Sequence, residues 1–349
     1  MKGPTRLAIL GATGSIGRQA LEVVAAHPDR LRVTRTGHRG DDLVALATAD
    51  DVDLVLVATP GMAGLDATLA ALEAGKRVAL ANKEVLVVGG HLIRALSGGA
   101  GERLRPVDSE HCALWQCLAG VGMADVARVT LTASGGAFRD TPLSEMAGVT
   151  PKSALRHPTW QMGPKVTVDS ATLVNKGYEV IETHWLYGLP YDRIDVVIHP
   201  ESVVHALVEL VDGSVIAQLA EPDMRLPIQY ALLWDHASGP ARRLDLSRAL
   251  DLRFRGAPDP ERYPCLDVVL ATARGRDRRA LIGLSAADEI AVERFLAGDL
   301  PFNGIADVLR RGAELVGGPA GGDPPSLPEI HTIDRAVRLA LSDAAVATG

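Results

Sequence analysis

Two acidic side chains, Asp108 and Glu110, stand two positions apart in the segment Pro-Val-Asp-Ser-Glu-His at residues 106–111. In an extended segment, side chains two positions apart point to the same side. Two carboxylates on one side repel each other unless a cation lies between them, and hard divalent ions prefer such oxygen ligands. The pair predicts half of a metal site, and a plain acidic loop is an equally good interpretation of the pair alone.

A second group of polar residues follows some sixty-five positions later, in a segment that we expect to form one helix over residues 170–187. Asn175 and Glu179 are four positions apart and therefore lie on one helical face, with Lys176 beside them. Such a face presents an oxygen ligand, a polar amide and a cation together. It supplies the partners that the acidic pair lacks.

Residues 157–165, which we call the flap, read His-Pro-Thr-Trp-Gln-Met-Gly-Pro-Lys. Proline and glycine interrupt any helical or strand period there, so Trp160 and Met162 are not explained by core packing. A mobile segment that excludes water once substrate is bound is the better interpretation. The tight turn that begins at Ser134 suits phosphate or hydroxyl contacts. His205 near a strand start is, taken alone, more often structural than catalytic.

A glycine-rich turn at residues 11–17, Gly-Ala-Thr-Gly-Ser-Ile-Gly, follows a short apolar strand and precedes a helix. Glycines allow the backbone to approach a pyrophosphate, and the free N–H groups at the helix start bind it. The spacing differs from the common G-x-G-x-x-G, but the strand–turn–helix context predicts a dinucleotide site. At the end of the second strand, Gly37 and Arg39 stand where NAD enzymes place an acidic residue. A cation suits a 2′-phosphate and favours NADP, unless Arg39 is an ordinary surface cation.

The elements that must position these residues alternate at first and then change character. Strands at 7–10, 32–36, 53–58 and 78–81 alternate with helices at 18–27, 42–48 and 64–75, which predicts a parallel sheet covered by helices. β-rich segments follow at 129–133, 196–198, 203–210 and 215–219, the last two joined by a hairpin at 211–214. Further helices are expected at 265–273, 285–296, 305–315 and 330–346, with a Gly/Pro linker at 317–328. We therefore predict an α/β protein with an N-terminal Rossmann-type parallel sheet (1–109), a central α+β catalytic domain (110–234), a connecting segment (235–262) and a C-terminal helical domain (263–349).

Length and composition limit the number of domains, the kind of partner and the compartment. A chain of 349 residues suggests about two domains, and a net charge of −7 argues against a nucleic-acid partner. Three cysteines without metal-ligand spacing indicate a reducing compartment. We see no signal peptide and no apolar run long enough to span a bilayer, so we expect a cytoplasmic protein without a membrane partner.

Taken together, the motifs resemble the 1-deoxy-D-xylulose 5-phosphate reductoisomerase family in order and along most of the chain. The segments that carry the resemblance are residues 11–17, 81–84 (ANKE), 106–111, 134–138 (SGGAF), 157–165, 168–182, 199–205 (HPESVVH) and 220–225 (AEPDMR). The resemblance implies reduction and rearrangement of that sugar phosphate to 2-C-methyl-D-erythritol 4-phosphate. It also implies NADPH, Mg²⁺ or Mn²⁺ (with Co²⁺ possible) and a homodimer.

The same resemblance implies a role for each matching residue. The implied metal ligands are Asp108, Glu110 and Glu179. The implied substrate contacts are Ser109, Glu110, Ser134, His157, Trp160, Ser170, Asn175, Lys176 and Glu179. The implied cofactor contacts are Thr13, Gly14, Ser15, Ile16, Gly37, Arg39, Asn82, Lys83, Glu84, Gly163 and Met224. The implied catalytic groups are Lys83, Glu110, His157 and Lys176, with His205 in support.

The chain departs from the family pattern at several places. Only one small helix fits between Gly40 and Asp53, where the family commonly carries more, so the part that flanks the adenosine end is short. Ser285 and Asp288 stand at common asparagine positions, and Glu201 at a common glutamine. Two other functions stay open: a metal-assisted NAD(P) oxidoreductase acting on another sugar phosphate, and a non-catalytic nucleotide-binding paralogue.

Overall fold

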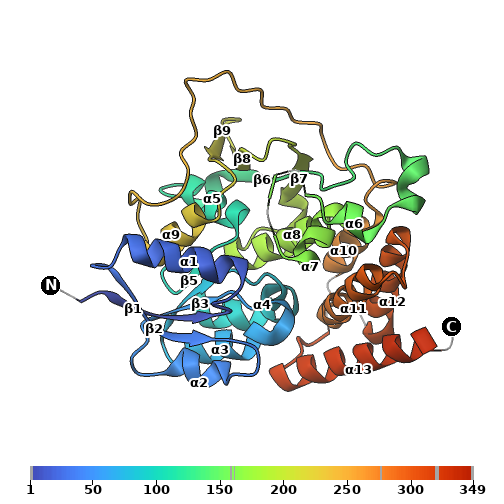
Figure 1. Ribbon diagram of the computed structural model, residues 1–349, viewed down its shortest axis with the longest axis horizontal. Helices are drawn as coiled ribbons and strands as arrows, with labels where there is room; N and C mark the ends of the chain where they lie inside the picture. Colours follow the sequence, from blue (N-terminus) through green and yellow to red (C-terminus); the bar gives the residue numbers. More distant parts are fainter. Residues whose placement is uncertain (1–2, 158, 161, 276, 319–321, 347–349) are drawn as a thin grey trace.

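Two sheets and a helical bundle build the molecule (Figure 1). The computed structural model describes residues 3–346 except 158, 161, 276 and 319–321. The sheet nearest the N-terminus and the C-terminal helices lie on opposite sides, and the second sheet lies above them in this view. None of the helices in the described ranges is long and apolar enough to cross a membrane.

The first sheet is entirely parallel and has the strand order β2-β1-β3-β4-β5. Its strands are β1 (Thr5–Leu10), β2 (Leu31–Gly37), β3 (Leu54–Val57), β4 (Arg77–Leu80) and β5 (Leu104–Pro106). Its helices are α1 (Ser15–Ala26), α2 (Leu43–Thr48), α3 (Leu65–Glu73) and α4 (Glu84–Ser97). The predicted parallel sheet is confirmed. β5 was not predicted, because a three-residue strand that contains Arg105 and Pro106 has no apolar run to reveal it.

The second sheet is mixed and has the order β7-β6-β8-β9. Its strands are β6 (Val126–Ala133), β7 (Ile194–Ile198), β8 (Val204–Leu210) and β9 (Val215–Leu219). The hairpin between β8 and β9 is confirmed by their antiparallel pairing. Apolar residues of α5 (Ser109–Cys117) and α8 (Val174–Tyr187) share one core cluster with β6 and β8. The two helices that carry the acidic motifs therefore rest on this sheet.

The helix expected over residues 170–187 is wrong as a single element. It is two helices, α7 (Pro164–Thr172) and α8, separated at Leu173. Leu173 has a φ of 59°, in the left-handed region that ends a helix. Its side chain is only 2% exposed. Packing against Ala133, Ile198 and Leu266 holds it there despite the strained backbone.

The remaining helices are α6 (Pro151–Ala154), α9 (Arg225–Leu233), α10 (Pro264–Arg274), α11 (Arg278–Ala297), α12 (Ile305–Val316) and α13 (Leu327–Val346). A long coil between α9 and α10 arches over the second sheet in orange (Figure 1). The helix expected at 285–296 begins seven residues earlier, because the Asp277 carboxylate accepts a hydrogen bond from the Arg279 backbone and caps it. The domain limits given above stay a prediction.

Candidate functional site

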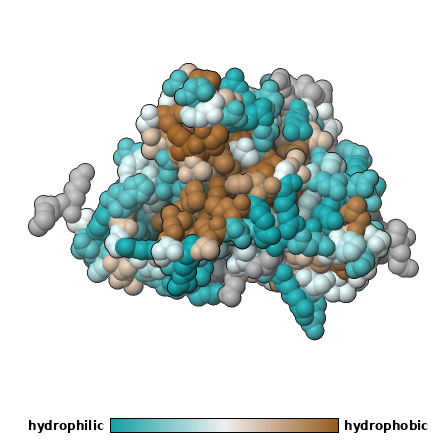
Figure 2. Space-filling view, turned by 90° about the horizontal axis from the view of Figure 1, so that it is seen from above, coloured by the Kyte–Doolittle hydropathy of each residue, from teal (hydrophilic) through white to brown (hydrophobic). Residues whose placement is uncertain are grey.

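A cavity of about 380 Å³ is lined by residues that follow strands of the first sheet, by residues of the second sheet and by residues of helices α7 and α8. An apolar band crosses the middle of the face seen in Figure 2, with hydrophilic surface on either side. Most sequence-predicted site residues line this one cavity. They are Gly14, Ser15, Ile16, Asn82, Lys83, Glu84, Asp108, Ser109, Glu110, Ser134, His157, Trp160, Met162, Gly163, Ser170, Asn175, Lys176, Glu179, His205 and Met224.

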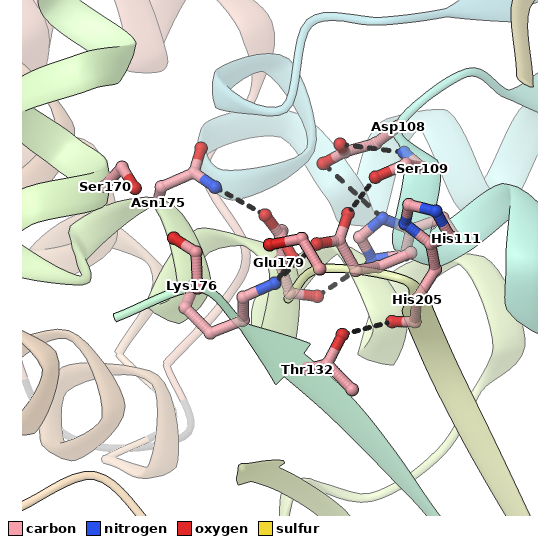
Figure 3. A network of polar contacts seen from close by, with 12 residues as sticks. Asp108, Ser109, His111, Thr132, Ser170, Asn175, Lys176, Glu179 and His205 are labelled. Carbon is pink, nitrogen blue, oxygen red and sulfur yellow. Dashed lines mark hydrogen bonds and ion pairs between the residues drawn. The ribbon is translucent and has the colours of Figure 1, made fainter. Parts of the chain in front are cut away.

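Three carboxylates meet at the deep end of the cavity. Asp108, Glu110 and Glu179 each place an oxygen within 4.8 Å of the others. The extended-segment argument for Asp108 and Glu110 was wrong in its geometry, because Asp108 caps helix α5 and Glu110 lies in its first turn. The residues converge nevertheless, because Glu179 of α8 lies across from that helix start (Figure 3).

Two lysines neutralise most of this charge. Lys83 Nζ lies 2.8 Å from Asp108 Oδ2 and 3.3 Å from Glu179 Oε1, and Lys176 Nζ lies 2.8 Å from Glu110 Oε1. Burial lowers the pKa of Lys83, but the surrounding carboxylates outweigh it and raise that pKa well above its ordinary value. The same balance raises the pKa of Lys176. Both lysines are therefore charged, and three anions face two cations in a buried site.

Sequence reasoning missed a second acidic group behind the first. His111 Nδ1 lies 3.7 Å from Asp108 Oδ2 and 3.4 Å from Glu182 Oε2, and both His111 and Glu182 are almost fully buried. Burial lowers the pKa of His111, but the Glu182 and Asp108 carboxylates raise it overall, to about 9. A charged His111 thus braces Asp108 from behind. The available signal was the spacing of three between Asp108 and His111, and between Glu179 and Glu182.

His157 organises the opposite wall of the cavity. Its Nδ1 accepts the backbone N–H groups of Thr159 and Trp160, so its proton is on Nε2. Nε2 lies 3.0 Å from both Ser134 Oγ and Ser170 Oγ, the latter at the end of α7. Burial lowers the pKa of His157 to about 4, which keeps the ring neutral at physiological pH. The single Nε2–H is shared between the two hydroxyl oxygens, so a serine that accepts it keeps its own hydroxyl proton free to point into the cavity. Pro158 and Gln161 of the flap lie outside the described residues.

The glycine-rich turn forms the other end of the cavity. Gly11 has a φ of 91°, and a Cβ there would lie 2.5 Å from the Ala58 carbonyl oxygen. A Cβ on Gly17 would lie 2.4 Å from the Gly11 carbonyl oxygen. These two positions therefore require glycine. Gly14 caps α1 with no side-chain hydrogen bond, so the first N–H groups of that helix face the cavity without a protein capping side chain.

The structure does not bring every predicted cofactor residue to the cavity. Thr13 and Arg39 are exposed, and Gly37 is buried at the end of β2; none of the three lines the cavity. Asn82 is also engaged, because its side-chain amide donates to the backbone carbonyl of Gly61 at 2.7 Å. Asn82 therefore braces the loop after β3 as well as lining the cavity.

The other histidine of the β-rich region is structural. His199 is fully buried, and its Nε2 accepts the backbone N–H groups of Val203 and Val204. Its Nδ1 donates to the Arg253 carbonyl oxygen at 2.9 Å. Glu201, one of the departures from the family pattern, pairs with the Arg253 side chain at 2.8 Å. Both residues fasten the long coil to the second sheet.

Fold and site define an α/β protein in which a dinucleotide-binding turn opens onto a carboxylate cluster of the kind that holds a divalent cation. Comparison with known proteins makes the class specific. Family models described as 1-deoxy-D-xylulose 5-phosphate reductoisomerase match residues 7–40 and 34–90, and those of its C-terminal domains match residues 104–187 and 219–340. The chain belongs to the 1-deoxy-D-xylulose 5-phosphate reductoisomerase family.

Individual relatives agree along nearly the whole chain. The reductoisomerase of Thermomicrobium roseum is 48% identical, covering 87% of this chain and 89% of its own. That of Pelotomaculum thermopropionicum is 43% identical, covering 95% and 96%. A crystal structure of the reductoisomerase in complex with NADPH, fosmidomycin and magnesium superposes with a TM-score of 0.89 at 35% identity, covering 98% of both chains. The Zymomonas mobilis enzyme in complex with NADPH gives a TM-score of 0.87 at 35% identity, covering 98% and 99%.

The comparisons also bear on the shortened N-terminal part. The alignment with the Pelotomaculum protein runs over 377 positions, more than the 349 residues of this chain, so that relative has residues without a counterpart here. One family model matches in two pieces that meet at residues 34–40. This is the end of β2, beside the short connection that sequence analysis singled out.

Proposed function

We propose that this chain is an NADPH- and divalent-metal-dependent enzyme that converts 1-deoxy-D-xylulose 5-phosphate into 2-C-methyl-D-erythritol 4-phosphate. The observation that carries the proposal is that one cavity contains both the carboxylate cluster and the glycine-rich turn at the start of α1. Family membership names the substrate. The arrangement of the residues explains how the chain would act on it.

The metal fits the donor set at Asp108, Glu110 and Glu179. Mg²⁺ and Mn²⁺ take carboxylate oxygens, and the three residues form a group of suitable size. The ammonium groups of Lys83 and Lys176 lie against these same oxygens, which supports a cluster that attracts cations. The bound ion would supply Lewis acidity to adjacent oxygens of the sugar phosphate. The lysines would then be displaced toward the substrate and stabilise its negative charge.

The substrate phosphate would bind at the part of the cavity formed by Ser134, Ser170 and His157. Ser134 and Ser170 can keep their hydroxyl protons free because their oxygens share the one Nε2–H of His157. Asn175 lines the same cavity and donates its side-chain amide to Glu179 Oε1. Three neutral donors and Lys176 can thus surround one phosphate, while His157 stays uncharged and orients the serines. Trp160 lies 6.1 Å from the His205 ring, centroid to centroid, and would close this end against water.

The cofactor would bind at the end of the cavity that the first sheet and helix α1 form. Its pyrophosphate would bind at the start of α1 beside Gly14, Ser15 and Ile16. Met224 and Gly163 line the cavity between that turn and the carboxylates, so the nicotinamide would rest against them. NADPH supplies a hydride once the carbon skeleton has rearranged. Arg39 lies outside the cavity. We therefore propose that Arg39 can bind a 2′-phosphate only if the loop after β2 moves toward the cavity.

The test is NADPH oxidation in the presence of 1-deoxy-D-xylulose 5-phosphate, with and without Mg²⁺ or Mn²⁺. We expect turnover that depends on the metal and produces the branched-chain polyol phosphate. Folded protein that binds NADPH but shows no metal-dependent turnover with this substrate would contradict the proposal. Turnover with another sugar phosphate alone would point to a different oxidoreductase, and NADPH binding without turnover to a non-catalytic paralogue.

We also propose a homodimer and a cytoplasmic location. β9 is an edge strand with exposed Val215 and Leu219, and an apolar strand edge is a natural pairing surface. All three cysteines are free, which suits a reducing compartment. Sedimentation analysis and cell fractionation test these two proposals, and a monomer at working concentrations would exclude the first.

A further inference from the structure

A partly buried lysine stands at the C-terminal end of the flap. Lys165 is the second residue of α7, and its Nζ contacts carboxylates from three helices. The distances are 3.1 Å to Glu84 Oε1 of α4, 2.7 Å to Asp169 Oδ2 of α7 itself and 2.6 Å to Asp288 Oδ2 of α11. The ammonium also lies 5.2 Å from the centre of the Tyr178 ring. One cation thus joins the flap and α7 to two other helices, α4 and α11.

This cluster contains three carboxylates and one ammonium group, and burying such an excess of negative charge costs free energy. Asp288 is fully buried and Asp169 is 2% exposed, yet three carboxylates face a single lysine. Among the described residues, Asp169 Oδ1, both Asp288 oxygens and the Tyr178 hydroxyl have no hydrogen-bond partner, so Asp288 holds Lys165 as an ion pair. Burial raises the pKa of both aspartates, and their mutual repulsion adds to the rise for Asp169. Buried ion pairs add little stability compared with apolar packing, so stability alone does not account for this cluster.

The position of the cluster suggests what it does. His157 fixes the beginning of the flap through its bonds to Ser134 and Ser170, and Lys165 fixes its end. Lys165 and Asp169 line the cavity, whereas Asp288 belongs to the C-terminal helical bundle behind it.

The neighbouring residue of α11 contacts the cofactor side. Glu289 pairs with Arg338 of α13 at 3.0 Å. A Cβ on Gly61 would lie 2.5 Å from Glu289 Oε1, so this side chain lies directly against the loop that carries Pro60 into the cavity. Helix α11 therefore supports both the end of the flap and the loop after β3 from one rigid element.

We propose that Asp288 is a positioning residue: it holds Lys165, and through Lys165 the C-terminal end of the flap, where Trp160 can cover the bound sugar phosphate. The proposal rests on the proposed function only for the identity of the substrate. Asp288 itself touches neither the cavity nor the reacting groups. Its effect is to couple the C-terminal helical bundle to closure of the flap.

The key experiment compares Asp288→Ala with Asp288→Asn. The amide oxygen of asparagine can accept a hydrogen bond from Lys165 in the same place, so we expect KM for the sugar phosphate to stay within about threefold of the parent value. Alanine removes that oxygen, and we expect KM to rise about tenfold, the effect of losing one contact to a charged group. The dissociation constant for NADPH should stay unchanged in both variants. Glu293→Gln, an exposed change on the same helix, is the matched control.

Hydrogen exchange of the segment 155–166 gives a readout that does not need turnover. With fosmidomycin and Mg²⁺ bound, Asp288→Ala should exchange faster in this segment than the parent protein, and Asp288→Asn should not. Lower thermal stability of Asp288→Ala with unchanged KM and unchanged exchange would mean a purely structural role and would overturn the proposal. An asparagine variant as defective as the alanine variant would also overturn it.

A second variant, Lys165→Met, tests the proposal if Asp288→Ala does not fold. Lys165→Met should show the same rise in KM and the same faster exchange. The double variant should be little worse than either single one, because both remove one connection. Fully additive effects would show that Asp288 and Lys165 act separately and would reject the proposal. Absence of turnover in the parent protein would contradict the proposed function, and the exchange comparison would still decide this inference.

Discussion

Glu179→Gln removes one charge from the carboxylate cluster and leaves its shape. Glu179 is 1% exposed, and its oxygens contact Lys83, Lys176 and Asn175. The change converts three anions facing two cations into two facing two. The amide oxygen can still accept from the lysines, so we expect the fold to survive. A divalent cation would lose a third of the charge that attracts it.

The size of the effect follows from Coulomb's law. Two unit charges 4 Å apart interact by about 4 kcal/mol at an effective dielectric constant near 20. Since about 1.4 kcal/mol corresponds to tenfold in affinity, one lost carboxylate should weaken metal binding by about a thousandfold. A doubly charged ion would lose more, and release of the lysines offsets part of that. At Mg²⁺ concentrations that saturate the parent protein, the variant should therefore be almost metal-free and inactive.

Two titrations measure this prediction. Calorimetric titration with Mn²⁺ gives the metal affinity, and quenching of NADPH fluorescence gives the cofactor affinity, which should change less than about threefold because the glycine-rich turn is untouched. Glu209→Gln, an exposed position on β8, is the control for the acid-to-amide change. Unchanged Mn²⁺ affinity in Glu179→Gln would refute the assignment of the cluster as the metal site. Loss of both affinities would refute the separation of the two ends of the cavity.

Three further predictions concern other parts of the site. The pKa of His157 falls from about 6.5 in the unfolded chain to about 4 in the folded protein. The contribution of His157 to the free energy of unfolding is therefore highest above pH 6.5, and it decreases as the pH falls from 6.5 through 4. His157→Gln should therefore flatten the pH dependence of the unfolding free energy in that window by about 1–2 kcal/mol after allowance for solvent screening, as measured by urea titration; an unchanged slope would contradict a neutral His157. Gly17→Ala should raise the NADPH dissociation constant at least about tenfold in a fluorescence titration, because its Cβ would meet the Gly11 carbonyl oxygen at 2.4 Å and displace the turn. Mg²⁺ at a hundred times its dissociation constant should stabilise the parent protein by about 2.7 kcal/mol, seen as a rise in unfolding temperature that EDTA reverses and that Glu179→Gln does not show.

The parallel sheet, the hairpin and the residue types of the site could be predicted because each leaves a local mark in the sequence. The last four residues of β1 and all of β3 are apolar and buried. Gly17 of the turn is required by a contact close along the chain, with the Gly11 carbonyl oxygen. The cluster around Lys165 could not be predicted. Glu84 and Asp288 are separated by some two hundred residues, and no period or spacing relates them. Contacts of that kind depend on how helices pack after the sheet has formed.

The error at Leu173 shows most clearly why the site needs tertiary structure. In one continuous helix, each residue turns the chain by about 100°, so Ser170 and Asn175 would point about 140° apart. Only one of them could then face the substrate. The left-handed residue between α7 and α8 redirects the chain, and both side chains line the same cavity. A leucine adopts that conformation only because burying its side chain among Ala133, Ile198 and Leu266 outweighs about 1–2 kcal/mol of backbone strain. The phosphate end of the site is therefore assembled by the core, from residues that favour an uninterrupted helix when judged by their sequence alone.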